Sequence, residues 1–300
     1  MKGHRALSRR QDRVRDTPLL PARLAARPML DSTIDIDRLL RETFLARVEH
    51  HATIGSTNDR ARHCAAEGRG PWPLLIAADM QTAGRGRGSN RWWTGQGSIA
   101  CTLLLEPGKL GVQRPCWRLI GIAAALAVAD VAAIRLSGHF VGLHWPNDVY
   151  AAGRKLAGIL VEVFANRLHA IGIGLNANNS AADAPVELRQ TAISLRDLTG
   201  TCFDRTDILV DLMQKIEQHL RQLAATPEAV TQRADAMCVQ RGQELTLQVG
   251  GHLITGRCAG IGPDGALLLD MPSGRQKFYC GAVVPRLSAG CAEATGLDTR

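Results

Sequence analysis

A segment rich in glycine and arginine, residues 81–93, constrains the fold of this chain more than any other stretch. Its sequence is QTAGRGRGSNRWW, with glycine at every second position from Gly84 to Gly88. This spacing disfavours a helix or a packed strand, because glycine costs backbone entropy there and buries no side chain. It suits a loop whose N–H groups approach an anion, and arginine adds a planar cation that fits carboxylate or phosphate. The segment predicts a loop that traps a small anionic ligand, with tryptophans available to pack on a flat ring.

Other interpretations of this loop stay open from its residues alone. A solvated basic turn or an arginine–glycine tether for nucleic acid would have a similar composition. A dinucleotide-binding loop is disfavoured, because Ser89 stands where that fingerprint has its last glycine. A P-loop is excluded, because no Gly-Lys-Ser/Thr sequence follows.

The positive charge of the chain is concentrated at its beginning. The formal net charge is +8, from 36 Lys and Arg against 28 Asp and Glu. Residues 1–30 hold eight of the basic and two of the acidic residues, which leaves residues 31–300 with 28 and 26, a net charge of +2. A nearly neutral body predicts no broad nucleic-acid-binding face. Residues 1–30 show no hydrophobic period and are predicted to be disordered; an organellar presequence is a weaker alternative, because serine is scarce there.

The eight cysteines show no metal-binding or redox signature. No C-x-x-C pair occurs, which disfavours a zinc site and a thioredoxin-like motif. Several cysteines lie inside apolar runs, so we expect buried thiols in a reducing compartment and a cytoplasmic protein. No apolar stretch is expected to span a membrane, because the alanine-rich run near 121–134 is interrupted by Asp130 and is typical of a core helix. The N-terminus lacks the apolar core of a signal peptide.

Hydrophobic periodicity outlines a mixed α and β body followed by a β-rich end. Ser56 with Asp59 fits the N-cap of a helix that runs to about Ala66. Residues 31–50 are long enough for one short helix and a strand, but too few for a winged-helix DNA-binding domain. Further strands are expected at 74–78, 98–105, 141–145, 156–163 and 171–176, helices at 117–135 and throughout 185–237, and short strands at 244–249, 253–258, 266–269 and 276–280.

Four polar motifs stand at the ends of these elements, each with a structural alternative. Residues 56–58 (Ser-Thr-Asn) either cap a helix or bind a polar ligand head. The Asn-Asp pair at 147–148 either forms a turn or holds Mg²⁺ or a lysine. Lys155 opens a strand, where most lysines are solvated. Asn176 ends a strand whose glycines allow close approach of a ligand or backbone, and its amide suits a base or a phosphate.

The order of these motifs resembles that of the biotin protein ligases, also called biotin–acetyl-CoA-carboxylase ligases. The resemblance covers about residues 50–285. Its most specific blocks are the Gly-Arg loop, Trp-Pro-Asn-Asp and Lys-Leu-Ala-Gly-Ile-Leu, in that order. The motifs that carry it are Ser-Thr-Asn, Gln-x-x-Gly-Arg-Gly-Arg-Gly with a following Trp, Trp-Pro-Asn-Asp, Arg-Lys-Leu-Ala-Gly-Ile-Leu-Val-Glu and Gly-x-Gly-x-Asn.

The resemblance implies an α+β fold with a mixed sheet, like that of class II synthetases, followed by a small SH3-like β-barrel. It divides the chain into a basic extension at 1–45, a biotin ligase catalytic domain at 46–238, an SH3-like domain at 239–288 and a tail at 289–300. The lack of room for a winged helix implies the monofunctional type, without the repressor role of some relatives.

The implied reaction is an ATP-dependent ligation in two steps that needs Mg²⁺. Biotin carboxylate attacks the α-phosphate of ATP to give biotinyl-5′-AMP, and a lysine of a biotin carboxyl carrier protein then takes the biotinyl group and releases AMP. No nucleic acid or membrane partner is expected, and the protein is expected to be a monomer or homodimer. Lipoate or octanoyl transfer is the alternative within this fold, and a nucleic-acid-binding module is a remote one.

The motifs assign a role to each candidate residue, as implied by the resemblance. Lys155 and Arg87 would be catalytic, with Lys155 bridging the biotin carboxylate and the α-phosphate, and Asp148 would be a possible Mg²⁺ ligand. The residues expected to bind biotin are Ser56, Thr57, Asn58, Gln81, Arg85, Gly86, Arg87 and Lys155, and those expected to bind the nucleotide are Trp92, Asn147, Asp148 and Asn176.

The sequence departs from the family pattern at two places near these residues. His144 precedes Trp145 where many relatives have lysine, so one cation is lost or becomes dependent on pH. Residues 88–90 (Gly-Ser-Asn) replace basic or glycine residues, and Arg91 is expected to compensate from a shifted position. Both departures bear on ATP affinity and on the ordering of the loop.

Overall fold

The computed structural model describes residues 33–68 and 70–284. Their largest element is a seven-stranded sheet with strand order β1-β2-β3-β7-β6-β5-β4. β1 and β2 pair in parallel and every other neighbouring pair is antiparallel, so the sheet is mixed, as predicted. The strands are β1 (Arg47–Ile54), β2 (Leu74–Gln81), β3 (Ile99–Leu105), β4 (Val141–His144), β5 (Asp148–Ala151), β6 (Arg154–Val163) and β7 (His169–Leu175).

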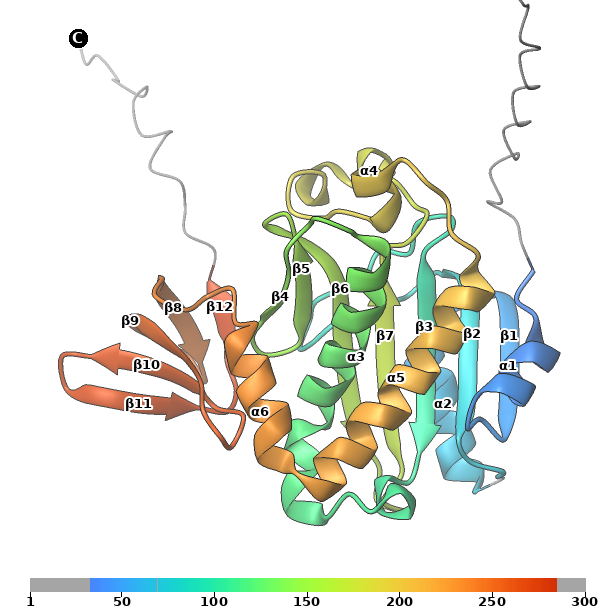
Figure 1. Ribbon diagram of the computed structural model, residues 1–300, viewed down its shortest axis with the longest axis horizontal. Coiled ribbons are helices and arrows are strands. Elements are labelled where there is room, and N and C mark those ends of the chain that lie inside the picture. Colours follow the sequence, from blue (N-terminus) through green and yellow to red (C-terminus); the bar gives the residue numbers. More distant parts are fainter. Residues whose placement is uncertain (1–32, 69, 285–300) are drawn as a thin grey trace, which may run out of the picture.

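Helices cover both faces of this sheet (Figure 1). On one face α3 (Ile120–Arg135) and α5 (Arg205–Ala225) lie side by side over the sheet, and the alanines and branched residues of α3 are buried around most of the helix. On the other face α2 (Thr57–Glu67) packs on the central strands through Ala61 and Cys64. The remaining helices are α1 (Ile36–Glu42), α4 (Leu195–Thr199) and α6 (Pro227–Ala236), with short 3₁₀ helices at Pro107–Leu110, Arg114–Leu119, Ala181–Asp183 and Val186–Leu188.

The segment Arg114–Arg135 is long and apolar enough to cross a membrane, so the expectation that no such stretch exists was wrong on length and composition. In this fold 67% of its most apolar window is buried inside the protein. Alanine dominates the helical part because α3 packs closely against both the sheet and its neighbour α5, which leaves little room for larger side chains. The segment serves here as the core helix that the sequence predicts.

The start of α2 confirms Ser56 as the N-cap residue but not a capping bond from its side chain. Ser56 occupies the N-cap position with extended backbone, but its side chain makes no capping hydrogen bond to the described residues. The amide of Gln81 from the end of β2 takes that role, with its Oε1 2.8 Å from the Thr57 N–H. A residue distant in sequence therefore caps the helix, which draws the first turn of α2 against the sheet.

A second sheet of five antiparallel strands, order β11-β10-β9-β8-β12, lies beside the β4 edge of the body (Figure 1). Its β9–β10 turn docks on the helical face, where the Trp145 indole donates to Gly265 O at 3.1 Å. Gly265 has φ +80°, and a Cβ there would lie 2.5 Å from Leu119 Cδ2, so only glycine fits this contact. The strands are β8 (Glu244–Val249), β9 (His252–Ile261), β10 (Leu267–Met271), β11 (Gly274–Phe278) and β12 (Ala282–Val284).

The fold confirms the predicted class and corrects several predicted elements. β5 and β12 were not predicted, and residues 185–237 are not helical throughout, because irregular chain separates α4, α5 and the 3₁₀ turn before them. The expected short helix and strand within 31–50 are α1 and the start of β1. The predictions for residues 1–30 and for the last dozen residues lie outside the described residues.

Candidate active site

A cavity of about 600 Å³ opens on the α2 side of the sheet. Its wall is formed by the start of α2, the Gly-Arg loop, the β4–β5 turn, strands β6 and β7, and the chain entering β12. Among the predicted site residues that line it are Ser56, Thr57, Asn58, Gln81, Arg85, Gly86, Arg87, Trp92, Asn147, Asp148 and Lys155. The structure thus brings together residues that lie almost 100 positions apart in the sequence.

One end of the cavity is polar, neutral and buried. Thr57 is 3% and Asn58 4% exposed, and the Thr102 hydroxyl of β3 lies 2.8 Å from Thr57 Oγ1 and 2.6 Å from Asn58 Oδ1. Gln81 Oε1 accepts from both the N–H and the hydroxyl of Thr57, and its Nε2 donates to Thr94 Oγ1 at 3.3 Å. Buried polar groups held in this way are rigid, because each would lose a hydrogen bond by moving.

Glycines of β6 and β7 form the floor of the cavity. A Cβ at Gly172 would overlap Asn58 Oδ1, and one at Gly174 would overlap the indole of Trp92. At Gly158 an added Cβ would lie 3.3 Å from the Trp92 ring and from Lys155 Cε. The predicted close approach to these glycines is therefore made by the protein's own side chains, and Trp92 lies flat on the floor.

The Gly-Arg loop is folded back on itself as a tight hairpin. Arg85 and Arg91 form an isolated antiparallel bridge, Gly86 N–H donates to Asn90 O at 2.8 Å, and Asn90 N–H donates to Arg87 O at 3.1 Å. Gly88 at the tip has φ +60°, a conformation that favours glycine. The departures at 88–90 thus form the exposed turn of the hairpin and leave its stem intact.

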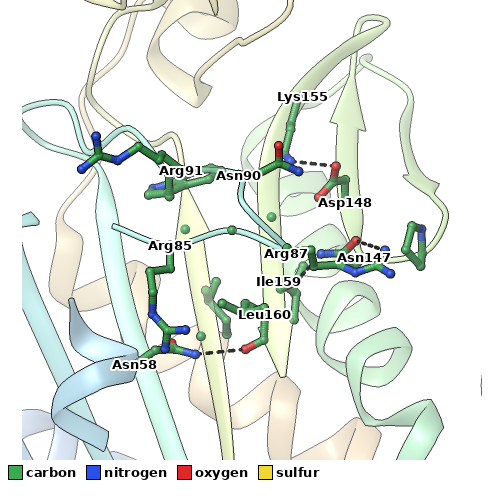
Figure 2. A pocket seen from close by; sticks show the side chains of 18 of the residues that line it. Asn58, Arg85, Arg87, Asn90, Arg91, Asn147, Asp148, Lys155, Ile159 and Leu160 are labelled. Carbon is green, nitrogen blue, oxygen red and sulfur yellow. Dashed lines mark hydrogen bonds and ion pairs between the residues drawn. The ribbon is translucent and has the colours of Figure 1, made fainter. Parts of the chain in front are cut away.

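Two of the three arginines of the loop, Arg85 and Arg87, point to opposite ends of the cavity (Figure 2). The Arg85 guanidinium lies at the polar end, where it pairs with Glu162 at 2.6 Å and with Asp59 at 3.0 Å. Arg87 reaches the other end and makes two long contacts, 3.5 Å to Asn147 Oδ1 and 3.4 Å to Gly281 O. Asn147 is held in turn by its amide donating to Ile159 O.

Lys155 lies at the same end as Arg87, paired with Asp148 (Figure 2). Its Nζ is 2.7 Å from Asp148 Oδ2, and it lies 5.8 Å from the centre of the Trp92 ring. The Lys155 side chain is 34% exposed. Of the two roles predicted for Asp148, fixing a lysine is the one that the structure contains, and the lysine is only partly solvated.

His144 faces this cationic end as a neutral ring. It stacks on Tyr150 with ring centroids 4.7 Å apart and planes 16° from parallel. Burial lowers the pKa of His144, while Asp148 acts against that shift and Lys155 adds to it. Burial, helped by Asp148, raises the pKa of Tyr150 to about 12. An imidazole with a lowered pKa is uncharged at neutral pH, so this position carries no positive charge there.

Asn176 is the predicted site residue that is not among the described residues lining the cavity. It is 4% exposed, accepts a hydrogen bond from Asn179 Nδ2 at 3.0 Å, and lies with its Nδ2 3.5 Å from Lys155 O. Asn176 therefore lies against the main chain of Lys155 and supports the cavity wall from behind.

Among the residues that sequence reasoning missed, Tyr150 and Gly281 line the cavity, and Thr102 and Glu162 bond residues that line it. Glu162 had a usable signal, because Gly158, Leu160 and Glu162 alternate along β6 and therefore share one face of the sheet. Thr102 lies in a fully buried strand, where a hydroxyl needs a partner. Nothing local distinguishes Gly281, since its place depends on how the second sheet packs.

Comparison with known proteins agrees with this geometry. Residues 53–178 match the sequence model described as the Biotin/lipoate A/B protein ligase family. A biotin--[acetyl-CoA-carboxylase] ligase of Mycobacterium tuberculosis is 34% identical over 258 residues, which are 82% of this chain and 91% of that protein. The chain belongs to this ligase family. A bifunctional ligase/repressor BirA of Bacillus subtilis is 31% identical over 238 residues, 77% of this chain and 71% of that protein.

A solved structure with the same fold is a biotin protein ligase from Aquifex aeolicus in complex with biotin and ATP. It has a TM-score of 0.69 and 24% identity, and it covers 80% of this chain and 98% of that one. The likeness extends over both sheets of this ligase-family chain and confirms the predicted fold class, including a β-rich end consistent with an SH3-like domain.

Proposed function

We propose that this protein joins biotin to a lysine of a biotin carboxyl carrier protein, using ATP and passing through biotinyl-5′-AMP. The observation that carries the proposal is the division of one cavity into a buried neutral polar end and an end that holds Arg87 and Lys155. Such a cavity suits a ligand that has an uncharged hydrogen-bonding head and an anionic tail.

The buried end would take the ureido ring of biotin. Thr57 and Asn58 present oxygen atoms in fixed directions, since Thr102 and Gln81 already hold them. The glycine floor lets Asn58 and Trp92 pack against the backbone, so these two side chains form the surface that the ring would meet. Ser56 is 3% exposed and makes no capping bond to the described residues, so its hydroxyl is available for the same head group.

The cationic end would bring the biotin carboxylate and the ATP phosphates together. These anions repel, and Arg87 and Lys155 would offset that repulsion and stabilise charge that develops on the α-phosphate. A carboxylate oxygen attacks the α-phosphorus, the bond from that phosphorus to the bridging oxygen breaks, and pyrophosphate leaves. In the second step the carrier lysine, as a free amine, attacks the acyl carbon, loses a proton and displaces AMP. Aligning both reactants supplies much of the rate, up to about 7–11 kcal/mol in well-oriented systems.

The nucleotide would bind at the outer side of this end. Trp92 would stack on adenine, Asn147 and Asp148 would contact the phosphates and Mg²⁺, and Asn176 would act beneath them. The described residues contain no group of three or more His, Cys, Asp or Glu side chains that suits a metal ion. The single carboxylate of Asp148 fits Mg²⁺ that is bound mainly by phosphate and water, and that ion would neutralise phosphate charge.

The proposal has three further parts. The carrier is a biotin carboxyl carrier protein, the enzyme is a monomer or homodimer, and it is located in the cytoplasm. The expectation that no nucleic acid binds is tested by the salt dependence of any binding to DNA, which would be steep for a phosphate-binding face.

The direct test is incubation of the protein with biotin, ATP, Mg²⁺ and a carrier domain, followed by mass spectrometry of the carrier. We expect a mass gain of one biotinyl group on a single lysine, dependent on ATP. A carrier that stays unmodified contradicts the proposal. Competition of lipoate against biotin for binding separates the alternative of lipoate or octanoyl transfer, since the neutral polar end favours a ureido ring over an apolar dithiolane.

A further inference from the structure

A carboxylate outside the predicted site, that of Glu162, borders the polar end: it bonds Asn58 and Arg85, which line the cavity, but is not itself among the described residues that line it. It accepts from Asn58 Nδ2 at 2.8 Å, from Arg85 at 2.6 and 3.2 Å, and from Arg62 at 2.5 Å. The Glu162 side chain is 20% exposed, and Arg85 and Asn58 help to lower its pKa against the effect of burial. It therefore remains ionised and joins α2, β6 and the Gly-Arg loop.

The contact with Glu162 fixes the orientation of the Asn58 amide. Asn58 Nδ2 donates to Glu162 and lies 3.5 Å from Leu160 O, so both of its N–H groups face β6. Its Oδ1 must then face the opposite way, toward the Thr102 hydroxyl and Gly172. An amide with this orientation offers an acceptor and no donor to the cavity, which suits a ring N–H.

The contact with Glu162 also engages the cation at the start of the loop. The Arg85 guanidinium bonds both Glu162 and Asp59, and its Nε is buried with no hydrogen-bond partner among the described residues. Around this point two arginines, at 62 and 85, face two carboxylates, at 59 and 162, so the local charge is balanced. The positive charge of Arg85 is therefore largely neutralised by these carboxylates, so Arg85 would attract an anionic ligand less than Arg87 does.

We infer that Glu162 is a positioning residue that couples recognition of the ligand head to closure of the Gly-Arg loop. Its carboxylate holds the Asn58 amide in the direction that reads the biotin ring, and it holds Arg85 so that the loop stays over the cavity. Arg85 acts as the anchor of the loop, and the anionic groups are left to Arg87 and Lys155. This inference rests on the proposed ligation of biotin. It assigns the polar end a role in holding the loop closed, in addition to binding the biotin ring.

Two substitutions of Glu162 separate the two contacts. In Glu162→Gln the side-chain oxygen can still accept from Asn58, but the ion pair with Arg85 is lost. We expect escape of biotinyl-5′-AMP, measured without carrier, to rise about 10-fold, because a hydrogen bond to a charged group contributes that much. Trypsin cleavage within the loop should rise with it, while the biotin Kd stays within about 3-fold. In Glu162→Leu, which loses both contacts, the biotin Kd should also rise about 10-fold.

Arg85→Gln provides the second variant, and it keeps the test valid if Glu162→Leu does not fold. It should reproduce the adenylate escape and loop cleavage of Glu162→Gln. Because both substitutions remove the same contact, the increase in the double variant should be smaller than the product of the two single increases. Asp270→Asn is the matched control. It breaks a similar two-contact pair with Arg275, at 2.7 and 3.1 Å, and neither residue is among the described residues lining the cavity.

The inference is overturned if Glu162→Gln shows wild-type adenylate escape and wild-type loop cleavage, or if its effect multiplies in full with that of Arg85→Gln. A purely structural role would lower the melting temperature of Glu162→Gln without changing either readout. Failure of the proposed function has a different signature, because the unmodified protein would then form no adenylate and label no carrier.

Discussion

The two ends of the cavity differ in how completely the protein already holds its own side chains. At the polar end Asn58 is 4% exposed and bonded on both sides of its amide. At the cationic end the Lys155 side chain is 34% exposed, and Arg87 has only contacts of 3.4 and 3.5 Å. The first end is built before any ligand arrives, whereas the second holds a partly exposed Lys155–Asp148 pair and an arginine, Arg87, that makes only long contacts.

This difference fits the two tasks that the site would perform. Recognition of a neutral head needs groups that do not rearrange, because each ordering step would subtract from affinity. Joining two anions needs cations that are free to move onto them, and a hairpin that can close over a reactive adenylate limits its hydrolysis. The following substitutions test whether the ends are as separable as the geometry indicates.

The largest effect is expected from Lys155→Ala at the cationic end. Formation of the adenylate should fall on the order of 1,000-fold or more, because a cation placed at developing charge is lost. The free energy of unfolding should change by no more than about 1 kcal/mol, since its ion pair with Asp148 is partly exposed. Pyrophosphate release measures the first quantity and thermal melting the second. Retained activity would return Lys155 to the role of a solvated lysine.

The second largest effect, on biotin affinity, is expected from a substitution in β7, where two nearby glycines can be compared. Gly172→Ala puts a methyl group onto Asn58 Oδ1, in the rigid end, and should raise the biotin Kd about 10- to 100-fold through overpacking of about 1–3 kcal/mol. Gly174→Ala meets the indole of Trp92, which can turn away, so biotin affinity should change less. Calorimetric titration with biotin checks both, and equal losses would show that the two ends are not separable.

A third effect is expected from Arg87→Gly, which removes the cation at the loop's far end. The adenylate should be held about 10-fold less well, because a charged hydrogen-bond donor is lost. Labelling of lysines on bystander proteins should therefore rise, while the melting temperature stays unchanged because the contacts of Arg87 are long. Mass spectrometry of a mixture of carrier and unrelated protein measures this, and a variant that labels only the carrier would argue against the role of Arg87.

The same contrast explains what could be predicted from the sequence. Strands such as β2 and β3 and the Gly-Arg loop follow from local residue types, so their approximate positions were correct. Ser56 is the N-cap residue of α2 as predicted, but its side chain makes no capping hydrogen bond to the described residues, and the Thr57 N–H donates to Gln81, which is distant in sequence. β5 was missed because its four residues begin inside a turn-forming motif. The alternation along β6 places Glu162 on the cavity face, but its pairing with Arg85 and the position of Gly281 depend on tertiary contacts, which no local pattern contains.

The smallest effect concerns His144, whose ring faces the cationic end beside Tyr150, Asp148 and Lys155. Because burial lowers its pKa below the ordinary value of 6.5, His144 gains its proton only as the pH falls beneath that value. The added charge would then attract phosphate, so the KM for ATP should fall at lower pH by about 3-fold, the effect of a partly screened ion pair.

His144→Lys supplies a fixed cation at this position and tests the same point. Its KM for ATP should be lower than that of the unmodified protein at pH 7.5 and should vary less between pH 5.5 and 7.5, about 3-fold at most. His144→Phe keeps an aromatic ring on Tyr150 without a titrating nitrogen, so it should retain the weaker ATP binding at every pH. The biotin Kd should not change in either variant, because His144 lies at the end away from Asn58. If the biotin Kd followed the ATP KM, charge at one end would reach the other, and the separation of the two ends would not hold.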